Sequence, residues 1–365
     1  MVKYIYQNKS WTDFTWDYGK ISAVLGEVRN LQGKLSGAMN ALGFSLKSEA
    51  LLETLTLDVL KSSEIEGEKL NRKQVRSSVA KRLGLDTGGL EFIDRNVEGV
   101  VEMLLDATQN YEHDISEGRL FGWHSALFPS GRSGMNKIET GKYRTGEMQV
   151  VSGALGKETV HYEAVPARGL KAEMDKFIDW INEKPSTDLV IKSAVAHLWF
   201  VTIHPFSDGN GRIARAISDM MLARSDGSRE RFYSMSNQIL KERKKYYSVL
   251  EETQKGDSDI TLWLFWFLNC LKNSLLNTET TLKSIFRKAK FWEAHKDTKL
   301  NERQRFIINK LFDNFHGKLT TSKWAKMTKT SPDTALRDIN DLIEKGILRQ
   351  GGAGGRSTNY ELIAE

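Results

Sequence analysis

One short stretch, residues 203–215, combines glycines, charged side chains and a histidine in an order that suits phosphate chemistry. It lies between two segments with helical spacing of apolar residues, so we expect a tight loop that leads into a helix N-terminus. Free backbone N–H groups and the helix dipole at such an end bind anions. Gly209 and Gly211 let the backbone approach an anion without an intervening Cβ, and Asn210 tolerates a left-handed backbone and adds a side-chain donor. The stretch therefore predicts a phosphate site.

The other side chains of this stretch fit a polyphosphate with a divalent cation. Arg212 and Arg215 project from one side of the first helical turns, where positive charge opposes the dipole unless an anion is nearby. Asp208 is a hard oxygen ligand suited to Mg²⁺, and His204 is a base that could accept a proton from an attacking hydroxyl. Phe206 is expected to anchor the loop inward. Each residue alone has an ordinary explanation, as a turn or a solvated face, but the combination favours a catalytic site.

The stretch resembles the signature of the Fic (filamentation-induced-by-cAMP) family: His, any residue, Phe, any residue, Asp or Glu, Gly-Asn-Gly-Arg, two residues, Arg. The resemblance covers about residues 120–277. It implies transfer of AMP from ATP, with Mg²⁺, to a Ser, Thr or Tyr hydroxyl of a target protein. By position in the signature, His204 would be the base and Asp208 the Mg²⁺ ligand. Residues 209–212 would hold the α- and β-phosphates, and Arg215 the γ-phosphate.

Two other functions remain open at this point. The same loop could transfer a different phosphate-linked group or remove AMP. The Doc branch of the family, a kinase-like variant, departs at the second glycine of the signature; Gly211 is intact here, so AMP transfer leads. Alternatively, the chain could be a transcriptional regulator whose Fic-like core senses nucleotide. Loss of His204 would abolish function in the enzyme and spare it in the regulator.

Two β-prone runs, residues 148–151 and 160–165, predict a hairpin that projects from a helical body. The resemblance identifies residues 148–165 as the family's flap, which docks an extended target segment by strand pairing. A purely structural hairpin is the alternative. Tyr246 and Tyr247 resemble residues that the family places near the nucleotide base, although helical spacing predicts that one of them belongs to the core.

An upstream segment resembles the family's inhibitory motif of Ser or Thr, three residues, Glu, then Gly or Asn. Ser62, Glu66 and Gly67 match it. Ser62 and Glu66 share one helical face, and Gly67 suits a helix C-terminus. The resemblance implies that Glu66 pairs bidentately with Arg215 and occupies the γ-phosphate position. An ordinary acidic helix end is the alternative, and inhibition in cis rests only on both motifs sharing one chain.

The apolar pattern predicts a mainly α-helical chain in four segments. These are an N-terminal helical region with the inhibitory motif (1–115), a Fic-like core with the hairpin (116–277), a linker helix (278–298) and a C-terminal region (299–365). In the last region, three helices followed by a glycine-turned hairpin predict a winged helix-turn-helix.

The predicted winged helix invites DNA binding through residues 299–365. Candidate contacts on its third helix and hairpin are Thr334, Arg337, Asp338, Asn340, Arg349 and Arg356. The same helix also carries Asp333, Asp341 and Glu344, which disfavours a phosphate surface. A protein-contact role therefore stays open.

The composition of the 365 residues sets outer limits. With 40% hydrophobic and 27% charged residues the chain is expected to be globular, and its net charge of +6 permits an anionic partner without requiring one. The single cysteine, Cys270, excludes an internal disulfide and is expected in the core. The N-terminus lacks a signal-peptide core and the densest apolar run is too short to cross a bilayer, so a cytoplasmic location without membrane contact is expected. Because family members are often dimers, a homodimer stays open.

Overall fold

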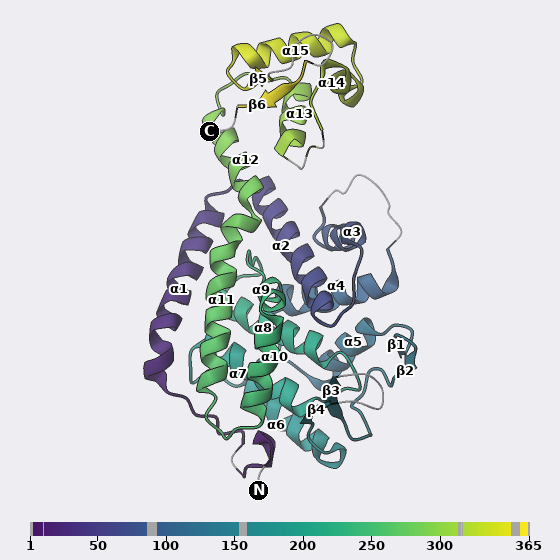
Figure 1. Cartoon of the computed structure of the whole chain (residues 1–365), viewed down its shortest axis with the longest axis vertical. Coiled ribbons are helices and arrows are strands. Elements are labelled where there is room, and N and C mark those ends of the chain that lie inside the picture. Colours follow the sequence, from purple (N-terminus) through teal and green to yellow (C-terminus); the bar gives the residue numbers. More distant parts are fainter. Residues whose placement is uncertain are drawn as a thin grey trace. The chain divides into compact units, whose positions relative to one another are not determined.

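The computed structural model is mainly helical, as the sequence predicted, with three two-stranded antiparallel sheets in its described part (Figure 1). It describes residues 3–9, 11–85, 93–152, 159–312, 315, 317–351 and 358–363. The chain divides into two compact units, Met1–Ala41 with Lys47–Thr278, and Leu42–Leu46 with Glu279–Glu365. The first unit takes in both the N-terminal region and the Fic-like core, whose division at residue 115 stays a prediction.

The first unit is mainly helical, and its helices lie both before and after the stretch 203–215 in the sequence. They are α1 (Tyr18–Asn40), α2 (Phe44–Ile65), α3 (Arg72–Arg82), α4 (Arg95–Gln109), α5 (Glu117–Leu127), α6 (Leu170–Asn182), α7 (Leu189–Ile203), α8 (Asn210–Asp226), α9 (Met235–Lys241), α10 (Arg243–Gln254) and α11 (Thr261–Thr281), with single 3₁₀ turns η1 (Ile5–Gln7) and η2 (Ala167–Gly169). Two small hairpins lie between α5 and α6: β1 (Arg132–Ser133) with β2 (Asn136–Lys137), and β3 (Gln149–Ser152) with β4 (Thr159–Glu163).

The centre of this unit is the pair α7 and α8. Every residue of α7 from Val190 to Ile203 is buried, as expected for a helix that is apolar all round. α8 packs along it and buries most of its length, from Arg212 to Ala223. The loop that joins the two helices is therefore held by the most buried part of the unit, which gives the predicted phosphate site a rigid base.

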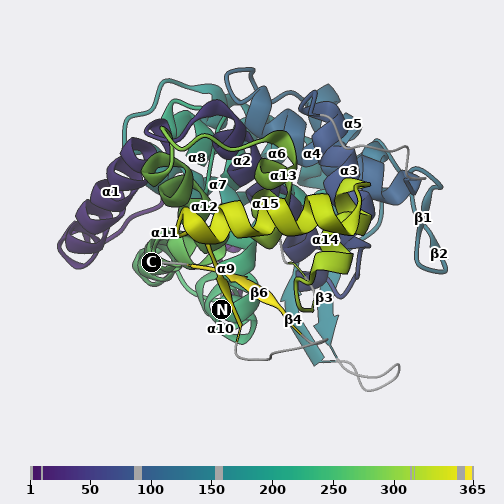
Figure 2. The same cartoon turned by 90° about the horizontal axis from the view of Figure 1, so that it is seen from above.

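The hairpin predicted over residues 148–165 is present as β3 and β4, which lie side by side in both views (Figures 1 and 2). Val150 pairs with Tyr162, and the register shifts directly after Val150. The tip, residues 153–158, lies outside the described residues. At the base, Tyr162 is buried against Tyr4 of the N-terminal segment, with ring centroids 5.1 Å apart.

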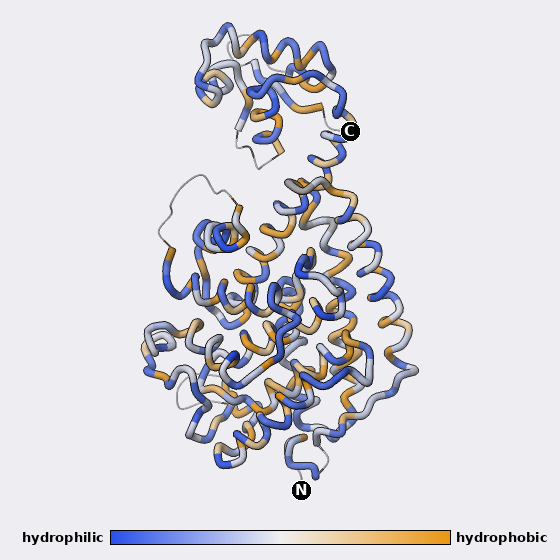
Figure 3. Tube along the Cα trace, turned by 180° about the vertical axis from the view of Figure 1, so that it is seen from behind, coloured by the Kyte–Doolittle hydropathy of each residue, from blue (hydrophilic) through white to orange (hydrophobic). Residues whose placement is uncertain are grey.

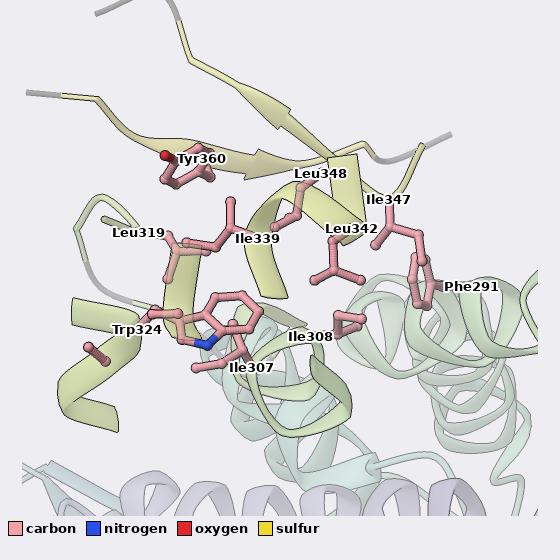
Figure 4. Close-up of a cluster of buried hydrophobic side chains, with 12 residues drawn as sticks. Phe291, Ile307, Ile308, Leu319, Trp324, Ile339, Leu342, Ile347, Leu348 and Tyr360 are labelled. Carbon is pink, nitrogen blue, oxygen red and sulfur yellow. The ribbon is translucent and has the colours of Figure 1, made fainter. Parts of the chain in front are cut away.

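The second unit contains α12 (Lys283–Ala294), α13 (Glu302–Phe312), α14 (Thr321–Thr328) and α15 (Pro332–Glu344), followed by β5 (Leu348–Gln350) paired with β6 (Tyr360–Leu362). Three helices followed by an antiparallel hairpin is the element order that we expected. Side chains from the helices and both strands point toward one another in one apolar core (Figure 4). Phe291 of α12 is part of this core, so the segment predicted as a linker helix packs into the unit.

One candidate DNA contact in this unit is wrong. Asp338 is buried, and it accepts hydrogen bonds from Arg303 Nε at 2.7 Å and Asn301 Nδ2 at 2.8 Å. The pair with Arg303 joins α15 to α13, so this carboxylate holds the unit together. Arg337 and Asn340 are exposed on α15, whereas Arg356 lies outside the described residues.

Along the helices, hydrophobic residues alternate with hydrophilic ones, as amphipathic packing requires (Figure 3). Cys270 is buried in α11, as predicted. Among the described residues, no helix combines the length and the apolar character needed to span a bilayer.

Candidate active site

The loop between α7 and α8 begins with a residue in an uncommon backbone conformation. His204 ends α7 with φ 55° and ψ 59°, and Gly209 precedes α8 with φ 79°. Asn210, a residue type that tolerates a left-handed backbone, is helical here, and the left-handed residues of the loop are His204 and Gly209. Asn210 is the first residue of α8, and its amide closes the loop by accepting from Phe206 N at 2.9 Å and donating to Phe206 O at 2.7 Å. Its amide thus holds the loop closed, and one N–H of Nδ2 is left over, so its role as an anion donor stays a prediction.

The geometry of His204 suits a general base. Its Nδ1 lies 3.2 Å from the carbonyl oxygen of Val201, which only accepts, so Nδ1 carries the proton and Nε2 keeps a lone pair. Burial lowers the pKa of His204 to about 4, and the positive charge of Arg144 acts in the same direction. The ring is therefore neutral at pH 7 and able to accept a proton.

Phe206 anchors the loop, as expected. Its ring is fully buried and stacks on the ring of His124, with centroids 4.2 Å apart and an interplanar angle of 11°. Burial also lowers the pKa of His124 to about 4, so the stacked ring is neutral at pH 7. This apolar contact fixes the middle of the loop and leaves its two ends to carry the polar groups.

The N-terminal turn of α8 has the features of an anion site. Gly209 is the N-cap, and no side chain caps the helix among the described residues. Arg212 Nε and Arg215 Nη1 are both buried and have no hydrogen-bond partner in the described part of the chain. Buried guanidinium groups with open N–H positions next to an uncapped helix N-terminus point to an anionic ligand.

A carboxylate from the residue directly after α2 already lies at this anion site. Glu66 Oε1 is 2.8 Å from Arg215 Nη2, while Ser62 accepts from Arg215 Nε at 3.0 Å through its hydroxyl and from Nη2 at 2.9 Å through its carbonyl. The bidentate pair that we expected is wrong: Glu66 contacts only Nη2, Nε binds the hydroxyl of Ser62, and Nη1 has no hydrogen-bond partner among the described residues. Gly67 follows the end of α2 with φ 87°, which confirms its predicted conformation.

The position of this carboxylate relative to α8 is defined by Gly211. A Cβ at Gly211 would collide with Glu66 Oε1, and it would lie 3.2 Å from both Glu66 Cδ and Arg215 Nη1. The carboxylate therefore rests directly on the first turn of α8. Only a glycine leaves room for an anion at this point.

The second arginine is also paired with α2's end, a contact that the sequence reasoning missed. Arg212 Nη1 lies 2.8 Å from Glu68 Oε2, and its guanidinium lies over the ring of Phe128 at 4.9 Å. Glu68 is two residues beyond Glu66 in the same acidic run, and this proximity was the signal that could have identified it.

Asp208 fits the role of a Mg²⁺ ligand beside bound phosphates. Its Oδ1 accepts from Gly209 N at 2.5 Å, and its Oδ2 contacts the hydroxyl of Ser133, a second residue that the sequence reasoning missed. Mg²⁺ commonly binds one or two carboxylates together with phosphate oxygens and water. The described residues hold no group of three or more His, Cys, Asp and Glu side chains that could bind a metal alone, so phosphate oxygens would have to complete the site.

The loop between α7 and α8 lies within a segment that matches a known protein family. Residues 114–222 match the Fic/DOC family, and residues 4–85 match a domain of unknown function, DUF4172. The chain contains a Fic/DOC domain. The match ends within α8 and includes His204, Asp208 and Arg215.

Relatives of this Fic domain carry names that state an activity. Protein adenylyltransferase fic-1 of Caenorhabditis elegans is 26% identical over 212 residues, which is 56% of this chain and 38% of the relative. A probable protein adenylyltransferase of Aquifex aeolicus is 26% identical over 215 residues, which is 59% of this chain and 60% of the relative. The chain thus spans less than two thirds of the length of these relatives.

Solved structures share the fold of the chain. A Fic family protein from Desulfovibrio desulfuricans G20 aligns over 95% of this chain and 96% of its own, with a TM-score of 0.58 and 21% identity. A variant of Fic-1 from C. elegans aligns over 72% of this chain and 73% of its own, with a TM-score of 0.51 and 22% identity. At these identities the likeness shows the fold alone.

The two tyrosines expected near the nucleotide base of the Fic domain differ in exposure. Tyr246 is buried, and its hydroxyl lies 2.9 Å from His197 Nε2, so it is the one that belongs to the core. Tyr247 is 39% exposed, with Arg243 stacked on its ring at 5.6 Å. Only Tyr247 presents an open aromatic surface, so the predicted contact with a base would rest on it.

Proposed function

We propose that the chain transfers AMP from ATP, with Mg²⁺, to a Ser, Thr or Tyr hydroxyl of a target protein. The observation that carries the proposal is the pairing of an anion site at the N-terminus of α8 with a neutral histidine whose Nε2 is open. The names of the relatives support ATP as the substrate of such a site.

The residues of the chain divide the chemistry between them. His204 Nε2 accepts the proton of the attacking hydroxyl as the oxygen bonds to the α-phosphorus. The N–H groups of the first turn of α8, with Arg212 and Arg215, bind the phosphates and stabilise the charge that develops as pyrophosphate leaves. Asp208 would hold Mg²⁺, which neutralises phosphate charge when it is bound.

Glu66 inhibits the enzyme in this proposal. Its carboxylate and a terminal phosphate are both anions that use the open N–H groups of α8 and Arg215, so the two compete for one position. Glu68 adds a second negative charge on Arg212. Inhibition in cis is supported by the contacts of α2 with α8 within one chain.

The hairpin of β3 and β4 would dock the target segment. Val151 and Val160 are 47% and 39% exposed on it, so apolar side chains stand open on neighbouring strands. An added strand would cover them and gain backbone hydrogen bonds at the same time. A contact of the C-terminal unit with DNA would be a separate activity, and the acidic residues on the exposed side of α15 weigh against it.

The test uses α-³²P-ATP and Mg²⁺ with four proteins: wild type, Glu66→Gly, Glu66→Gly with His204→Ala, and Glu64→Gly. Glu64 is a matched control, because it lies two residues away and forms its ion pair with Lys61. We expect label on protein, either the chain itself or a band in cell lysate, in Glu66→Gly and not in the double variant or in Glu64→Gly.

A parallel reaction with γ-³²P-ATP separates AMP transfer from phosphoryl transfer. Label from the γ-phosphate alone would overturn AMP transfer in favour of another transferred group. Binding of ATP without label from either nucleotide would favour a regulator that senses nucleotide.

A further inference from the structure

Arg144, which lies just before β3, ties the hairpin to the loop that carries His204. Its side chain is 4% exposed and donates to four backbone carbonyl oxygens. These belong to His204 at 2.8 Å, Gly146 at 2.8 Å, Ile203 at 3.4 Å and Val165. The backbone N–H of Arg144 also donates to the carbonyl of Pro205 at 3.0 Å.

Burying the charged side chain of Arg144 costs free energy of hydration. This cost argues that an arginine is needed at this position. Burial lowers the pKa of Arg144, because the guanidinium loses hydration. Its four side-chain hydrogen bonds go to neutral carbonyls, and the carboxylate of Glu147 favours the charged form without an ion pair to Arg144 among the described residues. A planar guanidinium is suited to this task, since its fixed fork of donors can reach several carbonyls at once.

One end of the arrangement fixes the backbone of His204. A left-handed conformation is unfavourable for a residue with a Cβ, and it persists only where the surroundings hold it. Arg144 binds the carbonyl oxygens of His204 and Pro205, so it sets the peptide planes that directly follow the ring. Arg144 thereby fixes the backbone from which the ring of His204 projects.

The other end fixes the hairpin. Gly146 precedes β3 and Val165 follows β4, so one guanidinium binds both ends of the hairpin. A second tie lies nearby, where the hydroxyl of Tyr162 donates to Thr202 O at 2.8 Å, two residues before His204. The same polar side chains thus hydrogen-bond to both the hairpin and the segment that carries His204.

We propose that Arg144 is a positioning residue that fixes the hairpin relative to His204, so that a hydroxyl on a segment paired with β3 or β4 arrives at Nε2. The proposal rests on the proposed AMP transfer. It predicts a loss in the chemical step and not in nucleotide binding, because the phosphate-binding residues keep their positions.

The kinetic test compares Arg144→Lys and Arg144→Met in the Glu66→Gly background. We expect kcat to fall about 10-fold for lysine, which keeps the charge but not the fork, and about 100-fold for methionine, a size typical of a reactant misplaced by about 1 Å. KM for ATP should stay within about twofold, since the groups that bind uniformly are unchanged.

The matched control is Arg119→Met. Arg119 is also mostly buried in the first unit, and it donates to the carbonyls of His113 at 2.7 Å and Asp106 at 2.9 Å away from the loop. If Arg144 only stabilises the fold, both methionine variants should lower kcat in proportion to the folded fraction, and that result would overturn the proposal.

Two further measurements read the connection without relying on AMP transfer. The imidazole ¹⁵N signals of His204 should shift in Arg144→Met, and amide hydrogen exchange should rise in both β3 and β4, with neither change in Arg119→Met. If Glu66→Gly transfers no AMP, the proposed function fails on its own, and these two measurements still decide the link. Unchanged His204 signals and unchanged exchange in Arg144→Met would overturn it.

Discussion

Two sets of polar contacts join α2 to α8, and only one of them borders the phosphate site. The first set, which we call the phosphate-side contacts, consists of Ser62 and Glu66 with Arg215. The side chain of Glu66 is 32% exposed, and Arg215 Nη1 has no partner among the described residues. This set is open to solvent on one side and keeps a donor for a ligand.

The second set, which we call the buried triad, consists of Asp58, Arg231 and Asp219. Arg231 lies between the two carboxylates, 3.0 Å from Asp58 Oδ2 and 2.6 Å from Asp219 Oδ1, and all three side chains are at most 2% exposed. Burial raises the pKa of Asp58 to about 7, and the neighbouring carboxylate of Asp219 adds to this against the attraction of Arg231. This set is therefore almost fully buried, whereas the carboxylate of the phosphate-side contacts is partly exposed.

The two sets are one helical turn apart. Asp58 and Ser62 are four residues apart on α2, and Arg215 and Asp219 are four residues apart on α8, so each helix presents both sets on one face. The difference between the two sets indicates how inhibition by Glu66 could be released. Because the buried triad holds α2 in place, we expect Glu66 to leave the site by side-chain rotation while α2 stays.

The largest effect is expected from Arg215, the residue that the phosphate-side contacts share with ATP. In the Glu66→Gly background, Arg215→Met should lower AMP transfer about 1000-fold, because a charge that stabilises the leaving phosphates is lost. Rates with α-³²P-ATP measure this. Arg224→Met, at the far end of α8, serves as the control. Equal losses of AMP transfer in both variants would show that Arg215 has no special role at the phosphates.

The buried triad should matter for stability instead. Arg231→Met leaves two buried carboxylates without their partner, and we expect the free energy of unfolding to fall by about 3–5 kcal/mol. Urea denaturation followed by circular dichroism measures it. Asp58→Asn should not raise AMP transfer above the wild-type level. A rise comparable to that in Glu66→Gly would mean that α2 itself moves during release.

The pH dependence of the unfolding free energy can test whether the histidine that lies next to both sets, His197, is buried in its neutral form. Burial lowers the pKa of His197 to about 3, with Arg215 acting in the same direction, and its ring contacts Ser218 beside Asp219. In the unfolded chain the ring takes up a proton below about pH 6.5. The unfolded state therefore binds more protons between pH 6.5 and pH 3, and stability falls as the pH is lowered through this range.

His197→Gln lacks this titration. The difference in unfolding free energy between wild type and His197→Gln should decline by up to about 1.4 kcal/mol per pH unit between pH 6 and pH 4. Urea denaturation at several pH values measures the slope. A difference that does not change with pH would show that His197 is not buried in its neutral form.

The smallest effect is expected from Ser62. Ser62→Ala removes the hydroxyl that accepts from Arg215 Nε, whereas the carbonyl of residue 62 remains. We expect the unfolding free energy to fall by about 1 kcal/mol, the size of one hydrogen bond, and AMP transfer to rise a few-fold because Glu66 loses a neighbour that orients Arg215. No rise in AMP transfer would mean that Glu66 acts without Ser62.

Much of the site was readable because its residues are contiguous. The spacing of His204, Asp208 and Arg215 lies within one loop and one helix, where local geometry decides which groups share a side. The helices on either side of the loop, the hairpin and the conformation of Gly67 followed from periodicity and turn chemistry in the same way. These features need no partner that is distant in the sequence.

The tertiary structure alone decided which distant groups meet these residues. Arg212 pairs with Glu68 across 144 positions, and Arg231 with Asp58 across 173. The acidic run after α2 offered a signal for Glu68, but no local pattern marks Asp58 as the partner of Arg231, because that contact arises only when α2 packs on the core. The left-handed backbone of His204 is likewise held by Arg144, 60 positions upstream. The chain's own sequence thus determined the chemical groups of the site, and the packing of α2, the hairpin and α8 decided what each group binds, since charges and hydrogen bonds depend on distance in space and not on distance along the chain.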